Sequence, residues 1–201
     1  MTLPPSYFEA MYAESPDPWG FTTRWYERRK YAMTVAALPR ERYRRGFEPG
    51  CSIGVLTALL AERCEQLLAT DIVPAAVETA KQRLAPCEGV DVAELEVPHD
   101  WPQGQFDLIV LSEIGYYLSA DDLELMLDRV VASLEPGGTL VAVHWRHPVA
   151  DYPLRGDDVH DLLATSPELH RVVRHQETDL VLEVFETEPT MSVAQRSGLL
   201  P

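Results

Sequence analysis

The stretch Phe47-Glu48-Pro49-Gly50-Cys51-Ser52-Ile53-Gly54 decides how this chain of 201 residues is interpreted. A short strand is predicted before it, over 45–48, and a helix after it, over 55–63. Two glycines around a small serine allow a tight turn and a close backbone approach to a ligand. The free N–H groups at the start of the helix favour a negative group such as a carboxylate. The spacing departs from G-x-G-x-x-G, which argues against a dinucleotide such as NAD.

The letters Gly-x-Ser-x-Gly have two other interpretations. In a hydrolase they would make Ser52 a nucleophile at a strand-to-helix turn, with a later histidine such as His160, His170 or His175. They could also form only a structural turn. This stretch alone leaves all three interpretations open.

An aspartate stands at the end of the next predicted strand. Asp71 follows the strand over 66–70 and precedes Pro74, which fits the first turn of a helix over 75–84. A carboxylate there can accept hydrogen bonds from both hydroxyls of a ribose. It can also cap the helix, and both roles can hold at once.

A third candidate contact follows the strand predicted over 90–97. Glu96 can accept a hydrogen bond from the amine of adenine, and Ile72 and Val97 can enclose the base. Glu94 can take the place of Glu96, and either carboxylate can equally be solvated. The three loops together form a candidate site for an adenosine-containing cofactor.

Strand and helix patterns alternate through the rest of the chain. Such alternation predicts an α/β fold with a mostly parallel sheet, helices on both faces and ligands at the carboxyl ends of the strands. The clearest strand covers 106–111, where a continuous apolar run predicts burial on both faces. The other predicted elements are helices over 23–38, 120–134 and 157–164, a strand over 139–143, and a closing hairpin over 170–176 and 180–187.

Composition restricts the class of protein. Hydrophobic residues make up 46% and charged residues 24%, which is ordinary for one globular domain over 1–201. A net charge of −15 disfavours nucleic acid and anionic membranes as partners. Three cysteines without a CxxC pair, no signal-like start and no long apolar run predict a cytoplasmic chain. No metal-binding pattern is found, and no metal is expected.

The motif, Asp71 and the segments 106–109 and 134–140 together resemble the class I S-adenosylmethionine-dependent methyltransferases. Three further segments narrow the resemblance to the NodS (nodulation protein S) family: 17–21 with 25–31, 111–118 and 144–153. The resemblance implies a Rossmann-like three-layer sandwich with a seven-stranded, mostly parallel sheet whose last strand is antiparallel. It also implies a helical cap over 1–40 and a core over 45–187.

The resemblance implies a methyl transfer from S-adenosylmethionine to the free amine of a small molecule, such as a deacetylated chitooligosaccharide or amino sugar. Transfer to oxygen or carbon of another metabolite, or a degenerate binding module without activity, are the alternatives. A monomer or weak homodimer is expected.

Candidate site residues follow from their places after the strands and in the cap. His144 is the first candidate for a general base and Glu113 the second. The expected cofactor contacts are Tyr26, Arg29, Glu48, Gly50, Gly54, Asp71, Ile72, Glu96, Val97 and Ser112. The expected substrate contacts are Trp19, Tyr116, Tyr117 and His147.

Overall fold

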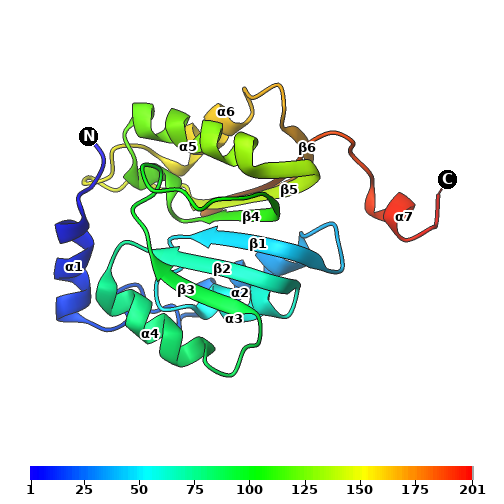
Figure 1. Cartoon of the computed structure of the whole chain (residues 1–201). Coiled ribbons are helices and arrows are strands. Elements are labelled where there is room, and N and C mark those ends of the chain that lie inside the picture. Colours follow the sequence, from blue (N-terminus) through cyan, green and yellow to red (C-terminus); the bar gives the residue numbers. More distant parts are fainter. Residues whose placement is uncertain (201) are drawn as a thin grey trace.

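Seven strands form one sheet in the order β3-β2-β1-β4-β5-β7-β6 in the computed structural model, which describes residues 1–200 (Figure 1). Neighbouring strands from β3 to β5 are parallel, and β7 is antiparallel to both β5 and β6. The mostly parallel sheet with an antiparallel last strand is therefore confirmed. The strands are β1 (Tyr43–Pro49), β2 (Cys64–Asp71), β3 (Val90–Glu94), β4 (Phe106–Ser112), β5 (Leu134–Trp145), β6 (His170–Gln176) and β7 (Leu180–Glu186).

Helices cover both faces of the sheet, as Figure 1 shows, which confirms the three-layer sandwich. Alternate residues of β4 pack into the apolar clusters on opposite faces of the sheet. Ile109 and Leu111 pack in the cluster that holds the buried sides of α5 and α6, whereas Leu108 and Val110 pack with α2 and α3. The helices are α1 (Pro5–Glu14), α2 (Trp25–Ala36), α3 (Val55–Ala61), α4 (Pro74–Leu84), the 3-10 turn η1 (Gly115–Tyr117), α5 (Ala120–Ser133), α6 (Gly156–Leu163) and α7 (Val193–Arg196).

The topology fixes where a ligand can bind. β1 pairs with β2 on one side and with β4 on the other, so the chain reverses its direction of winding next to β1. Open parallel sheets bind ligands outside the carboxyl ends of the strands at such a point. The loop after β1 lies there.

Three element boundaries differ from the sequence prediction. α1 falls within the helical cap that the resemblance implied over 1–40, but no helix was predicted there from the residues themselves, and all its residues are at least partly exposed. β5 begins at Leu134, five residues before the strand that was predicted over 139–143. Leu134 pairs with Phe106, and a register shift before Leu108 absorbs the extra residues. β3 ends at Glu94, three residues earlier than expected.

No helix within residues 1–200 is both long and apolar enough to cross a bilayer. The same residues contain no group of three or more His, Cys, Asp or Glu side chains arranged to hold a metal ion.

Candidate active site

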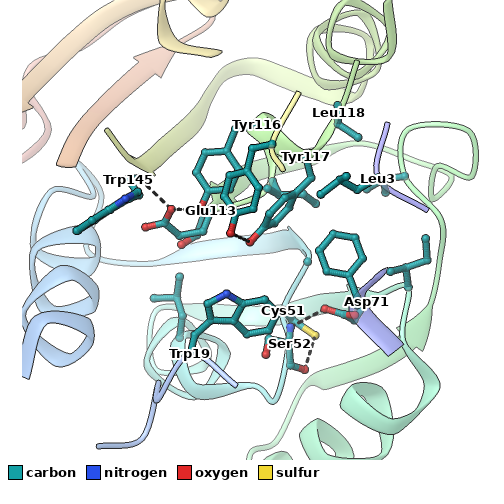
Figure 2. Close-up of a pocket in the computed structure, with 18 of the residues that line it drawn as sticks. Leu3, Trp19, Cys51, Ser52, Asp71, Glu113, Tyr116, Tyr117, Leu118 and Trp145 are labelled. Carbon is teal, nitrogen blue, oxygen red and sulfur yellow. Dashed lines mark hydrogen bonds between the residues drawn. The ribbon is translucent and has the colours of Figure 1, made fainter. Parts of the chain in front are cut away.

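A cavity of about 730 Å³ opens at the carboxyl edge of the sheet. Its floor comes from the loops after β1, β2 and β4, and its cover comes from α1, α2 and the segment between them. Figure 2 shows Cys51, Ser52 and Asp71 on one side and Glu113, Tyr116 and Tyr117 on the other. The cavity therefore brings together residues from both halves of the sequence.

The loop after β1 bends through left-handed backbone positions. Gly50, at φ 72°, borders the cavity, and a Cβ there would come within 2.9 Å of the side chain of Ile114. Gly54, at φ 76°, caps α3, and its added Cβ would crowd α4 at Ala80 and Leu84. Gly54 therefore shapes the loop and faces α4, whereas Gly50 brings the backbone to the edge of the cavity.

Asp71 ties this loop to the end of β2. Its Oδ2 accepts from the backbone N–H of Ser52 at 2.8 Å, and its Oδ1 accepts from that of Val73 at 3.0 Å. Burial raises the pKa of the carboxyl group, and the backbone donors oppose that shift. Ile72 beside it borders the cavity. Each carboxylate oxygen can accept a second hydrogen bond, so the group can still serve a ligand.

Glu48 is a fully buried carboxyl group in the cavity wall. Within residues 1–200 its Oε2 has no hydrogen-bond partner. Burial raises its pKa to about 8, so near neutral pH it is largely protonated. A buried polar atom of this kind is a place where a ligand can supply the missing partner.

We expect Glu48 to reduce the stability of the ligand-free protein as the pH rises. Its pKa is about 8 in the folded protein, above the ordinary value of 4.5. The stability that is present below the ordinary value is therefore lost as the pH rises through the pKa of the folded state. Glu48→Gln keeps a neutral group of the same shape. The melting temperature of Glu48→Gln relative to wild type should therefore rise between about pH 5 and about pH 9. The exposed Asp100→Asn is the control, and a difference that stays constant with pH would contradict the role of burial.

Two further expected contacts border the same side of the cavity. Glu96 and Val97 line it together with Ile72, whereas Glu94 ends β3 and borders a smaller neighbouring hollow. This placement favours Glu96 over Glu94 as the candidate contact to a base.

The N-terminal segment closes the cavity from above. Tyr12 on α1 is hydrogen-bonded to Ser52 through the two side-chain hydroxyls, and its ring packs edge-on against Trp19. The backbone N–H of Leu3 donates to the carbonyl of Tyr117 at 2.9 Å. These contacts hold the N-terminal segment, the roof of the cavity, to the loops after β1 and β4.

Glu113 projects into the opposite side from the loop after β4, at a left-handed φ of 57°. Its Oε1 accepts from Lys30 Nζ at 2.8 Å. Its Oε2 accepts from the backbone N–H of Trp145 at 2.9 Å and from the Tyr116 hydroxyl (Figure 2). A carboxylate has about four lone-pair sites, so within the described chain one site on Oε1 is left without a donor.

Lys30 is the functional candidate that sequence reasoning missed. It is 1% exposed and lies between Glu113 and Glu27, with Nζ 2.7 Å from Glu27 Oε2. Burial alone would lower the pKa of Lys30, but the two carboxylates raise it above its ordinary value. The only signal in the sequence is an (i, i+3) acid–base pair, which is typical of a solvated helix face.

Aromatic side chains complete this side of the cavity. Tyr26, Tyr116, Tyr117 and Trp145 line it, and Ser112 and Trp19 border it elsewhere. The ring of Tyr26 meets that of Trp145 edge-on at 5.3 Å, and the buried Tyr26 hydroxyl has no hydrogen-bond partner in the described chain.

Besides Gly54, three further expected site residues lie outside the cavity wall. His144 points toward α6, because side chains alternate along β5 and the next residue, Trp145, takes the cavity side. Arg29 forms a two-point ion pair with Glu177, and its Nη1 donates at 2.7 Å. His147 pairs at the surface with Asp179 at 2.7 Å. These contacts place the three side chains away from the cavity in which the sequence suggested a role for them.

Comparisons with known proteins point to one family. Residues 11–152 match the family described as Nodulation protein S (NodS). Nodulation protein S of Bradyrhizobium diazoefficiens is 30% identical over 127 residues, which is 62% of this chain and 61% of that protein. The chain spans 53–61% of the length of the first three curated relatives.

Two solved structures extend the likeness. The N-methyltransferase NodS of Bradyrhizobium japonicum WM9, in complex with S-adenosylhomocysteine, has a TM-score of 0.82 and 27% identity, covering 91% of this chain and 97% of that one. A candidate methyltransferase from Pseudomonas syringae is 50% identical, with a TM-score of 0.73 over 81% of this chain and 99% of that one.

Proposed function

The chain belongs to the NodS family, and on that premise we propose that it is an S-adenosylmethionine-dependent methyltransferase that methylates the amine of a small molecule. The solved relative named above as an N-methyltransferase holds S-adenosylhomocysteine, the demethylated form of this donor. The observation that supports the proposal most is that Asp71 and Glu48 open into the same cavity as Glu113.

The residues on the β1 and β2 side fit the donor. Asp71 offers a carboxylate where a ribose would lie, and Ile72 and Val97 offer apolar surface for a base. Glu48 lines the same cavity, and its carboxyl group is a candidate contact for the ammonium of the donor's amino-acid end. When bound, S-adenosylmethionine would supply a methyl group made electrophilic by its positively charged sulfur.

The residues on the β4 side suit an amine. The open site on Glu113 Oε1 can accept one N–H of the acceptor and so orient its lone pair. Aromatic rings at Tyr26, Tyr116 and Trp145 favour a group that carries positive charge, as the nitrogen does once it has taken the methyl group and the sulfur has lost its charge. The roof from α1 excludes water, and alignment is most of what a displacement with a good leaving group requires.

Calorimetry with S-adenosylhomocysteine, followed by transfer of a labelled methyl group to a panel of acceptors, tests the proposal. We expect binding of the demethylated donor and labelling of amino sugars, including a deacetylated chitooligosaccharide. Labelling only of hydroxyl or carbon acceptors would move the assignment to O- or C-methylation. No uptake of the donor or its product by folded protein would overturn the proposed activity.

A further inference from the structure

A buried chain of polar side chains runs behind the wall that carries Glu113. The backbone N–H of Gly115 donates to His144 Nε2 at 3.1 Å. His144 Nδ1 lies 3.1 Å from His160 Nε2, and His160 Nδ1 lies 2.8 Å from Glu183 Oε2. The two histidines and Glu183 are 0%, 4% and 1% exposed. None of these three side chains has a part in the binding roles described above.

The contacts permit one arrangement of protons. A backbone N–H can only donate, so His144 Nε2 carries no proton and His144 Nδ1 carries one. His160 Nε2 must then accept, so the proton of His160 is on Nδ1 and points to the Glu183 carboxylate. Arg171, at 2.9 Å, and Arg174, at 3.5 Å, hold the other oxygen of that carboxylate from β6.

The Gly115 end of this row of hydrogen-bonded side chains is packed against the candidate site. Gly115 begins η1, and a Cβ there would come within 2.6 Å of Val159 and 3.2 Å of His144 Nε2. The Tyr116 ring lies edge-on to His144 with centroids 5.4 Å apart, and its hydroxyl donates to Glu113. A shift of the His144 ring would therefore move the turn that carries Tyr116.

We propose that His144 is a positioning residue: its bond to Gly115 keeps Tyr116 and Glu113 in place. Glu183 acts through His160 and fixes the tautomer of His144 that makes this bond. This role rests on the proposed function, because it is the amine side of the cavity that is positioned. If Glu183 no longer orients His160, the proton of His160 can move to Nε2. His144 Nδ1 would then have to accept from it, which places the proton of His144 on Nε2, against the N–H of Gly115.

The charged groups around His144, His160 and Glu183 bear on whether His144 takes up a proton. His144 faces His160 on α6, Tyr116 on η1 and, at longer range, Lys30 on α2, while Asp157 of α6 and the β6 arginines lie near His160 and Glu183. Burial is the main cause that lowers the pKa of His144 well below its ordinary value. A charged ring would break the acceptor bond to Gly115, so we expect His144 to remain neutral across the working range.

The first experiment is a nitrogen-15 correlation spectrum of the histidine rings in the wild-type protein. It should show both His144 and His160 neutral and protonated on Nδ1. A proton on Nε2 of either ring would overturn the proposal. The measurement needs neither donor nor acceptor, so its result is independent of whether the proposed methyl transfer is found.

The second experiment compares His144→Gln with His144→Leu. The glutamine amide can still accept from the N–H of Gly115, and leucine cannot. We expect His144→Leu to turn over about tenfold more slowly than His144→Gln, which matches the loss of one buried hydrogen bond. Both variants should bind S-adenosylhomocysteine within about twofold of wild type. Equal turnover in the two variants would show a space-filling role and overturn the proposal.

Glu183→Gln extends the test to the outer end of the chain. We expect turnover to fall about tenfold with little change in the affinity for the demethylated donor. Glu188→Gln is the matched control, because Glu188 forms a carboxylate–histidine pair with His170 at the surface, at 3.4 Å. If Glu183→Gln turns over as fast as the control, Glu183 does not act on His144 through His160.

Discussion

Replacing Asp71 with alanine is expected to raise the dissociation constant for S-adenosylhomocysteine by about a hundredfold. A charge-assisted hydrogen bond contributes about 1.5–3 kcal/mol, and two such bonds to a ribose diol correspond to this factor or more. The carboxylate also accepts from the N–H groups of Ser52 and Val73, so its loss loosens the loop after β1 as well. Isothermal titration calorimetry measures the effect directly.

Two further variants separate binding from folding. Asp71→Asn keeps one acceptor oxygen and should lose less affinity than the alanine variant. Asp91→Ala removes an exposed acid from the adjacent strand β3 and should bind like wild type. If Asp71→Ala folds, by its circular dichroism and melting curve, and binds as tightly as wild type, the donor cannot lie where we place it.

Glu113→Gln should reduce the turnover number by about a hundredfold or more, while the affinity for the demethylated donor stays within about twofold. Lys30, Tyr116 and the Trp145 N–H all donate to the two oxygens of Glu113. An amide NH2 at either position must therefore face a donor, so the side chain cannot keep its present orientation. The site that would hold the acceptor amine is lost with it.

Glu177→Gln is the matched control for this variant. Glu177 is also paired with a basic residue of α2, Arg29, but that pair lies apart from the cavity wall. The control should turn over acceptor at the wild-type rate. Steady-state kinetics that show a raised KM for the donor and an unchanged turnover number in Glu113→Gln would contradict a role on the acceptor side.

The sequence was sufficient for the central sheet because each deciding pattern was local. The apolar run of β4 required cover on both faces, and the loop after β1 and Asp71 marked the ends of the first two strands. α1 could not be predicted in the same way. Its residues are all at least partly exposed, and its position depends on contacts with distant loops, such as that between Tyr12 and Ser52.

The side of the cavity that faces the acceptor was predicted less well, for two physical reasons. Whether His144 or Trp145 faces the ligand depends on the phase of β5, and a shift of one residue reverses every side chain. Lys30 is buried because Glu113 reaches it from 83 positions further along the chain, a pairing that no local pattern reveals.

The roof over the cavity is attached to the same loop that borders the proposed donor site. Ser52 contacts Asp71 through its backbone and Tyr12 through its hydroxyl, so one short loop carries both the floor of the proposed donor site and the attachment of α1. If a bound donor stabilises the position of Ser52, it also stabilises the contact of Ser52 with Tyr12, and with it the closed position of the N-terminal segment. By thermodynamic linkage, closure then tightens occupancy by the same factor. Exchange of spent donor for fresh donor would consequently follow the opening of the first helix.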